Sequence, residues 1–326
     1  MEVLLAAAKE IDLTPIMRLR AEQSAHTLTD DPLTADLILF LGNPTYEPHL
    51  LLEHPLYRSH PDKCAVYSED DGYLPLLPGV YCSARHDESS RIGRTFTWSY
   101  ISFPNPYVAK AAGKKSFLFS FQGGSTSILR KRLYRLSFNR PDVLIEDTSV
   151  YHHWDLNQAD RERRQQSYAE TLAASHFVLC PRGAGTGSIR LFEVMQAGVA
   201  PVLIADDYPL PPHVPWDTFL LRIAEKDIHR LPELLEPHIA SSSERGRLAR
   251  ESWLNHFAPD REFDAVVDLA ATALRHEPPD EAQFRSRQRS MIFALNLRRS
   301  LRSKARSAIL AALNLLRLKS PYRLNR

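Results

Sequence analysis

Short apolar runs alternate with polar turns and helix-forming segments along most of the chain. In residues 2–28 the apolar positions follow a helical spacing, which Pro15 interrupts or restarts. Residues 73–107 are rich in Pro and aromatic side chains and show little periodicity, so we expect an irregular region there. Strands are expected at residues 35–41, 64–68, 116–121 and 143–146, and a helix at residues 127–136.

From Asp160 onward the expected elements alternate regularly. They are a helix at 160–174, a strand at 177–180, a glycine-rich loop at 181–187, a helix at 188–197 ending at Gly198, and a strand at 199–204. This alternation is typical of an open, mostly parallel α/β sheet, and further helices are expected after residue 226. We therefore expect an N-terminal domain over residues 1–150, a C-terminal domain over 151–276, and a helical tail over 277–326.

Composition changes this picture in two ways. The sparse cysteines, Cys64, Cys82 and Cys180, have no metal-ligand spacing, so we expect buried small side chains rather than disulfides or a zinc site. The net charge of +2 hides an asymmetry, because residues 1–281 hold 29 basic and 39 acidic residues and the rest hold 12 basic and none acidic. No apolar run is long enough for a transmembrane helix and no signal-peptide pattern is present, which favours a cytoplasmic location.

The segment that follows Cys180 is the first candidate site, because ligands of open α/β sheets bind at the carboxyl ends of the strands. Its sequence, PRGAGTGS, contains three glycines that let the backbone approach a ligand, and it opens a helix whose N–H groups suit phosphate oxygens. Arg182 can add a bidentate contact to a diphosphate, and Thr186 and Ser188 can cap the helix or bind phosphate.

The helix that follows carries a second pair of candidates. Arg190 and Glu193 share a face, and Glu193 either accepts hydrogen bonds from ribose hydroxyls or pairs with Arg190 on a solvated surface. The loop lacks the lysine of GxxxxGK[ST], and Ser188 or Arg190 stands where GxGxxG needs its last glycine. A P-loop protein and a dinucleotide-binding dehydrogenase are therefore disfavoured.

The same segment resembles a known family. Residues 177–211, FVLCPRGAGTGSIRLFEVMQAGVAPVLIADDYPLP, strongly resemble the core of the exostosin-like glycosyltransferases: a strand ending CPRG, an R-L-x-E helix, QAG, a P-V strand and a D-D-aromatic-x-L-P close. Residues 115–133, KSFLFSFQGGSTSILRKRL, resemble the family's F-x-G strand-turn and Arg-containing helix. The resemblance weakens towards residue 35 and is absent after about residue 275.

The resemblance implies an α/β fold of the GT-B architecture, in which two Rossmann-like domains face each other across a cleft, with C-terminal helices. The C-terminal domain would hold a nucleoside diphosphate sugar, often a uridine diphosphate sugar, and Arg130 would reach its phosphates from the N-terminal domain. The donor-site residues expected there are Arg130, Arg182, Gly183, Gly185, Thr186, Ser188, Arg190 and Glu193. Eukaryotic members usually have a membrane anchor, and this chain shows none, so a bacterial member is expected.

The family's glucuronyl-transferring members invert the anomeric centre, so the resemblance implies a direct displacement here. Such a displacement requires a general base for the acceptor hydroxyl and positive groups that stabilise the leaving diphosphate. Arg182 is expected to supply catalytic charge with the loop N–H groups, so neither a metal nor another cofactor is expected, and Asp206-Asp207 do not form a D-x-D pair. Asp71 is the expected base, because it resembles the last acid of the family's Y-S-D-x-D pattern. A solvated acidic turn is the alternative, and the rival bases are Glu69, Asp70, His86 and Asp87.

Three features leave alternatives open. Asp206 and Asp207 follow a strand and either contact the sugar or acceptor or form a turn before Pro209. An aromatic group either stacks on an acceptor glycan or packs in the core: Trp98, Tyr100, Phe103 and Tyr107. The basic tail, residues 284–326, either lies on an anionic membrane near lipid-linked acceptors or packs on the body. Nucleic acid is disfavoured as a partner because the acidic body would repel it.

The leading hypothesis is an inverting glycosyltransferase that joins a nucleotide-sugar donor to a glycan or lipid-linked acceptor in polysaccharide synthesis. The alternatives are a catalytically silent glycan- or nucleotide-binding module of the same fold, and a membrane-surface scaffold that acts through the tail. The intact set of Arg182, Arg190 and Glu193 favours the enzyme.

Overall fold

A computed structural model describes residues 1–7, 12–42, 48–102, 104–110, 113–149 and 158–276, with scattered residues between 286 and 304. Residues 1–277 cluster as one unit and residues 278–326 as a second, and each is described by itself. The expected tail helix, with its basic and apolar stripes, lies almost entirely outside the described residues.

The first sheet is built entirely from parallel strands, in the order β2-β1-β3-β4-β5-β6. Its strands are β1 (Glu2–Ala7), β2 (Thr27–Leu28), β3 (Leu37–Gly42), β4 (Cys64–Ser68), β5 (Gly79–Tyr81) and β6 (Thr95–Phe96). The accompanying helices are α1 (Thr14–Arg20), α2 (Pro48–Leu52), α3 (Pro55–Ser59) and α4 (Glu88–Arg91). The strands expected at residues 35–41 and 64–68 are therefore present.

The prediction of helical structure from residue 2 is wrong for residues 2–7. Residues 2–7 form β1, which pairs with β3 from Val3 opposite Leu37 to Ala7 opposite Leu41. The side chains of residues 3–6 are all buried, as fits a strand covered on both faces, whereas an amphipathic helix would expose part of such a run. The helix begins only at α1, with Pro15 in its first turn, where a missing N–H costs nothing.

The region expected to be irregular contains two further strands. β5 and β6 are three and two residues long and extend the first sheet beyond β4. Runs this short show no periodicity, and only their pairing with a neighbouring strand defines them.

The second sheet is also parallel, in the order β11-β10-β9-β7-β8. Its strands are β7 (Phe117–Gly123), β8 (Val143–Asp147), β9 (Ser175–Pro181), β10 (Ala200–Ile204) and β11 (Leu221–Arg222). Its helices are α5 (Ile128–Tyr134), α6 (Gln158–Ala173), α7 (Ile189–Ala197), α8 (Leu231–Leu235) and α9 (Ser242–His256). Short 3-10 helices complete the described chain: η1 (Ala21–Gln23), η2 (Pro61–Lys63), η3 (Val108–Lys110), η4 (Trp216–Thr218), η5 (Glu225–Arg230) and η6 (Glu236–Ser241).

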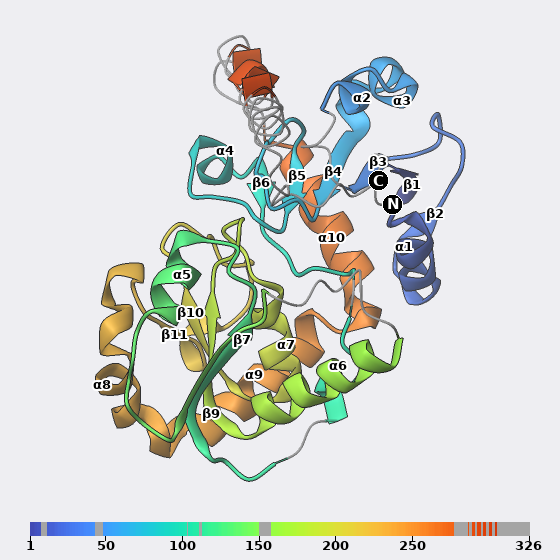
Figure 1. The fold of residues 1–326 in the computed structure, drawn as a ribbon. Helices are drawn as coiled ribbons and strands as arrows, with labels where there is room; N and C mark the ends of the chain where they lie inside the picture. Colours follow the sequence, from blue (N-terminus) through green and yellow to red (C-terminus); the bar gives the residue numbers. More distant parts are fainter. Residues whose placement is uncertain are drawn as a thin grey trace. The chain divides into compact units, whose positions relative to one another are not determined.

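Both faces of the second sheet are covered, with α5 and α8 on one side and α6, α7 and α9 on the other (Figure 1). Alternate residues of β9 serve the two faces: Phe177 and Leu179 pack with the α5 and α8 side, and Val178 and Cys180 with the α6 and α7 side. This explains why the strand is a continuous apolar run.

The division between the sheets differs from the boundary expected at residue 150. Strands β7 and β8 hydrogen-bond with the second sheet, so the chain crosses from one sheet to the other between β6 and β7. The expected boundary falls just beyond β8, which ends at Asp147 and is followed by Thr148 and the exposed Ser149. The chain returns to the first sheet at α10 (Pro259–Leu274), which packs on β4, β5, β6 and α1.

The carboxyl ends of the two sheets contact each other. The Thr186 hydroxyl donates to the carbonyl of Ala84 at 2.6 Å, and the Thr97 hydroxyl donates to the carbonyl of Pro209 at 2.6 Å. Two parallel α/β sheets that meet at these edges, with α9 and α10 closing the unit, fit the GT-B architecture expected from the sequence. Within the described residues no helix combines the length and the hydropathy needed to cross a bilayer.

Candidate functional site

The glycine-rich loop expected at residues 181–187 begins at Pro181, the last residue of β9, and leads to Ser188 at the start of α7. The N–H of Arg182 donates to the carbonyl of Ile204 at 3.0 Å, which joins the start of the loop to the end of β10. Ser188 is the N-cap residue of α7, and Gly198 ends the helix with a left-handed φ of 70°, as its position in the sequence predicts.

Glycine in this loop is explained first by contact with the first sheet. A Cβ atom on Gly185 would lie 2.3 Å from Ser83 Oγ and 2.7 Å from the main-chain oxygen of Asp71. A Cβ atom on Gly187 would lie 2.3 Å from the carbonyl oxygen of Cys82. The space that we expected to admit a ligand is therefore filled by protein atoms on the Cβ side of these two glycines.

Gly183 and Thr186 are held in a similar way. A Cβ atom on Gly183 would lie 3.4 Å from both Thr126 Oγ1 and Arg130 Nη2. The Thr186 hydroxyl donates to Ala84, so it neither caps α7 nor is directed to a phosphate in this structure. Residues near both sheets therefore contact the loop.

Arg130 does not reach the loop from the N-terminal domain, which corrects the expectation. It lies on α5, which packs against the second sheet, and the Arg130 side chain is buried, with the residue 9% exposed. Its guanidinium donates to the carbonyls of Arg182 at 3.2 Å, Gly124 at 3.2 Å and Pro181 at 3.1 Å. Because β7 and β9 are adjacent in the sheet, the residues after β7 and the loop after β9 meet at one edge, where the contact is made.

Arg182 is tied to a carboxylate that the sequence did not indicate. Its Nε lies 2.6 Å from Glu225 Oε1 and its Nη2 lies 3.1 Å from Glu225 Oε2, which is a bidentate ion pair. The main-chain N–H of Glu225 donates to Asp206 Oδ1 at 3.1 Å. Asp206 was expected either to contact the sugar or acceptor or to form a turn. In the structure its carboxylate accepts a hydrogen bond from Glu225, the partner of Arg182.

Arg190 is buried and contacts aromatic rings, which excludes the solvated ion pair considered for it. Its guanidinium carbon lies 4.6 Å from the ring centroid of Phe121 and 5.8 Å from that of Tyr168, and Nη2 donates to the carbonyl of Gln122. The Arg130 guanidinium lies over the same Phe121 ring, at 5.5 Å. Burial, together with the charge of Arg190, lowers the pKa of Arg130 to about 10.

Glu193 lies one turn along α7 and accepts a hydrogen bond from the hydroxyl of Tyr168, on α6, at 2.7 Å. Burial and the Glu193 charge raise the pKa of Tyr168 well above its usual range, so the phenol stays a donor. This partner orients one carboxylate oxygen, as a residue that binds a diol needs.

Three polar atoms at this edge are buried and have no hydrogen-bond partner among the described residues: Ser188 Oγ, Arg190 Nε and Gln122 Oε1. Ser188 is 5% and Arg190 8% exposed. Buried polar atoms are normally satisfied, so an unpaired hydroxyl and an unpaired N–H at the start of α7 indicate a place for a polar ligand or ordered water. Together with the buried guanidinium groups they favour an anion.

Asp71, the expected base, is exposed and follows β4, which ends at Ser68. Its main chain lies against Gly185, so the structure brings the expected base and the glycine-rich loop together at the contact of the two carboxyl edges. Its carboxylate is near enough to Arg130 to raise the pKa of that residue, although burial outweighs the effect.

Glu69, a rival for the base, is held by the protein. Its Oε1 accepts hydrogen bonds from the Tyr67 hydroxyl at 2.9 Å and from the N–H groups of Ile101 at 2.5 Å and Ser102 at 3.1 Å. Its Oε2 accepts from the Ser102 hydroxyl. Both carboxylate oxygens of Glu69 are therefore engaged by hydrogen bonds within the protein, which is a structural role.

Three other residues were candidates for the general base: Asp70 is buried, Asp87 accepts hydrogen bonds from the protein, and His86 is exposed. Asp70 is 4% exposed. Asp87 Oδ1 accepts from the N–H of Ser90 at 3.0 Å and from the Tyr73 hydroxyl at 3.3 Å, which is a local structural role. His86 is exposed, its main-chain N–H donates to the carbonyl of Asp207 at 3.3 Å, and its side chain stays a rival to Asp71.

The aromatic side chains are mainly part of the core. Trp98 is 4% exposed and its ring lies 4.7 Å from that of Phe257, and the Tyr100 hydroxyl lies 3.1 Å from Ser83 Oγ. Phe103 lies outside the described residues. The free cysteines are buried, as expected.

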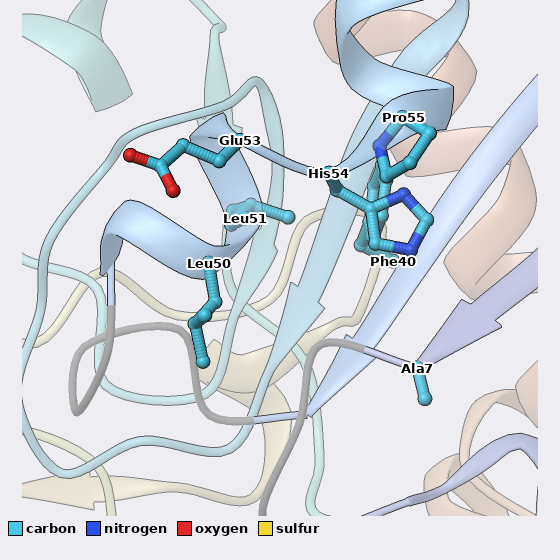
Figure 2. Close-up of a pocket in the computed structure, with 7 residues that line it drawn as sticks. All are labelled: Ala7, Phe40, Leu50, Leu51, Glu53, His54 and Pro55. Atoms are coloured by element: carbon cyan, nitrogen blue, oxygen red, sulfur yellow. The ribbon is translucent and has the colours of Figure 1, made fainter.

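A pocket of about 430 Å³ lies elsewhere on the first sheet, beside α2 and α3 (Figure 2). The His54 ring lies edge-on to Phe40, with ring centroids 5.1 Å apart. The Glu53 side chain points away from these two rings (Figure 2). None of its lining residues is among those expected for the donor: Ala7, Phe40, Leu50, Leu51, Glu53, His54 and Pro55. Across the described ranges, no three His, Cys, Asp or Glu side chains gather as a metal ion would need.

Sequence reasoning missed Glu225, Tyr168 and Gln122. Glu225 is 43 residues from Arg182 in the chain, and Tyr168 is 25 residues from Glu193. No local spacing links such pairs. Gln122 follows the strand predicted at residues 116–121 and Tyr168 lies on the helix predicted at 160–174, whereas no strand was predicted beside Glu225.

Comparison with known proteins places these residues in context. The model of the exostosin GT47 domain matches residues 58–237, more than half of the chain. The chain is 33% identical over 156 residues to an exostosin-1 homolog of Caenorhabditis elegans, which covers 44% of this chain and 40% of that protein. It is 38% identical over 85 residues to a probable glucuronoxylan glucuronosyltransferase, IRX7, of Arabidopsis thaliana, which covers 26% of this chain and 19% of that protein.

The chain thus spans less than half the length of these relatives. Among solved structures, MurG of Acinetobacter baumannii matches 82% of this chain and 99% of its own, with 14% identity and a TM-score of 0.38, which is too low to support a conclusion.

Proposed function

Because the chain belongs to the exostosin GT47 family, we propose that it is a glycosyltransferase that moves a sugar from a nucleoside diphosphate sugar to a glycan acceptor. Relatives that match the chain are named exostosin and glucuronosyltransferase, which supports a uridine diphosphate sugar as the donor. The silent binding module and the membrane scaffold gain no specific support from the described residues.

One observation carries the proposal. At the start of α7, Ser188 Oγ and Arg190 Nε are buried without a partner, and the guanidinium groups of Arg190 and Arg130 lie over one ring, that of Phe121. Two neighbouring buried cations are costly by themselves, and the lowered pKa of Arg130 reflects this cost. A diphosphate at this edge would relieve both effects.

The donor's parts follow from this placement. The diphosphate lies by the Arg182, Ser188 and Arg190 side chains and the N–H groups at the start of α7, where the helix dipole favours negative charge. Glu193, oriented by Tyr168, accepts hydrogen bonds from the ribose hydroxyls. Arg130 acts by holding the carbonyls of the loop, and the N–H groups of the glycines add to the anion site.

Transfer is an inverting displacement at the anomeric carbon. Asp71 takes the proton of the acceptor hydroxyl as that oxygen attacks, and the leaving diphosphate oxygen is stabilised by the positive groups of the loop. These cations replace the metal ion that many transferases use, so we expect activity in the presence of EDTA. An anionic membrane as a partner of residues 284–326 is a separate proposal, and vesicle flotation with and without those residues tests it.

Thermal-shift measurement with a panel of nucleotides is the primary test. UDP or a UDP-sugar should raise Tm by several degrees at a concentration well above Kd, since a ligand that binds only the folded state stabilises it by mass action. GDP and ADP, and uridine without phosphates, serve as comparators. If no nucleoside diphosphate raises Tm and none of the nucleotide sugars is consumed, the proposal is wrong.

A further inference from the structure

The pairing of Arg182 with Glu225 is less exposed than the bidentate pair of Arg230 with Glu233, whose side chains are 44% and 66% exposed. Arg182 and Glu225 share two short N–O contacts, and their side chains are only 30% and 19% exposed. Because the pair is partly desolvated and bidentate, it restricts the guanidinium to one plane and one direction.

Glu225 also connects three strand ends of the second sheet. It begins η5 just after β11, its main-chain N–H donates to Asp206 beyond β10, and its carboxylate holds Arg182 beyond β9. The N–H of Asp206 lies 3.5 Å from Glu225 Oε1 in return. Glu225 therefore links the segments after three neighbouring strands, through its main chain and its carboxylate.

We infer that Glu225 is a positioning residue, which orients Arg182 for the diphosphate of the donor. The inference rests on the proposed function. Glu225 engages the Nε and Nη2 edge of the guanidinium, so the Nη1 group is the donor that this carboxylate leaves available. Arg182 then presents a fixed N–H edge to the ligand, and little rotamer entropy is lost when the ligand binds.

The sign of the effect separates positioning from simple electrostatics. Removing a carboxylate near an anion site would by itself strengthen the binding of an anion, because like charges repel. If Glu225 positions Arg182, removing the Glu225 carboxylate instead weakens binding. Ligand binding must then also restrict the Arg182 guanidinium, and the rotamer entropy lost opposes binding.

The test is isothermal titration of the full chain with UDP. Glu225→Gln should weaken UDP binding about tenfold, as loss of one charge-assisted contact does, and Glu225→Asp should recover part of this loss. In Arg182→Gln, the further change Glu225→Gln should have no added effect on Kd, because Glu225 acts through Arg182. Tm measured for every variant separates lost binding from lost folding.

Glu233→Gln is the matched control. It removes a second bidentate Arg–Glu pair from the same region, with Arg230 at 3.0 and 2.7 Å, which lies on the surface. This variant should bind UDP as the wild type does. Unchanged or tighter binding in Glu225→Gln, or additive losses in the double variant, would overturn the inference. Wild-type protein that fails to bind UDP would instead contradict the proposed function, and the inference with it.

Discussion

Two carboxylates, Glu193 and Asp71, have different surroundings, and the proposal gives them different tasks. Glu193 is partly buried on α7 and accepts a hydrogen bond from Tyr168. Asp71 is exposed, at the end of β4. An oriented, ionised carboxylate suits hydroxyl recognition, whereas an accessible one can meet the acceptor and release its proton to water afterwards. Binding and transfer should therefore separate by mutation.

Glu193→Ala should weaken UDP binding by about tenfold or more, because it removes an acceptor for the ribose hydroxyls. Tyr168→Phe keeps the carboxylate but removes the group that orients it, so a smaller loss is expected. Calorimetric titration measures both. Glu170→Ala, at an exposed position of α6, is the control and should bind normally. Full affinity in Glu193→Ala would exclude it from the donor site.

Asp71→Asn should leave UDP binding within about twofold and lower kcat by about 100-fold or more, since general-base catalysis contributes on that scale. Release of UDP during transfer is the measurement. Asp62→Asn is the control, because Asp62 is exposed and precedes β4 whereas Asp71 follows the same strand. If Asp71→Asn keeps full activity, His86 becomes the next candidate.

The glycine-rich loop shows how one element meets two constraints. Its N–H groups open α7, and its glycines allow the first sheet to approach closely at Gly185 and Gly187. The composition of the loop was visible in the sequence. The sequence predicted the role of the loop at the start of α7 but not its contact with the first sheet. That contact depends on a segment about 100 residues away in the chain.

Gly185→Ala should destabilise the protein by several kcal/mol, because the new Cβ would overlap Ser83 and the backbone at Asp71. Denaturant unfolding gives the difference in free energy. Gly124→Ala is the matched control, since its Cβ would meet nothing closer than 3.7 Å, and its effect should be below about 1 kcal/mol. Equal stability of the two variants would show that the sheets do not approach as described.

At the scale of residues 1–277, α10 returns the chain from the second sheet to the first and carries a buried carboxyl. Glu262, 7% exposed, lies 3.0 Å from Arg20 Nε. Burial raises the pKa of Glu262 to about 7, although Arg20 acts in the opposite direction. The folded protein therefore keeps this proton at a pH where the unfolded chain has released it.

This predicts a pH-dependent stability with a definite sign. Between about pH 4.5 and 7 the folded state binds more protons at Glu262 than the unfolded state, so the free energy of unfolding falls as pH rises. Glu262→Gln should remove this slope and gain up to about 3 kcal/mol relative to wild type between pH 4.5 and 8. Urea unfolding at several pH values measures it. Glu251→Gln, exposed on α9, should keep the wild-type slope.

The sequence by itself determined the parts of this protein that depend on neighbours in the chain. Apolar runs of strand length, Gly198 just after α7 and the residue pattern from 177 to 211 were sufficient to predict β7, β8, β9, β10, α7 and the family, because strand propensity and helix capping depend on nearby residues. Where the runs were too short, at β5 and β6, or buried on both faces, at β1, periodicity gave no signal or the wrong one.

Only the tertiary structure decided which strands share a sheet and which side chains share a site. It placed Arg130 beside Arg182 within the second sheet, paired Arg182 with Glu225, and brought Asp71 against Gly185 from the other sheet. These contacts join residues far apart in the chain. They form because parallel strands end at common edges, and no spacing along one segment determines which edges will meet.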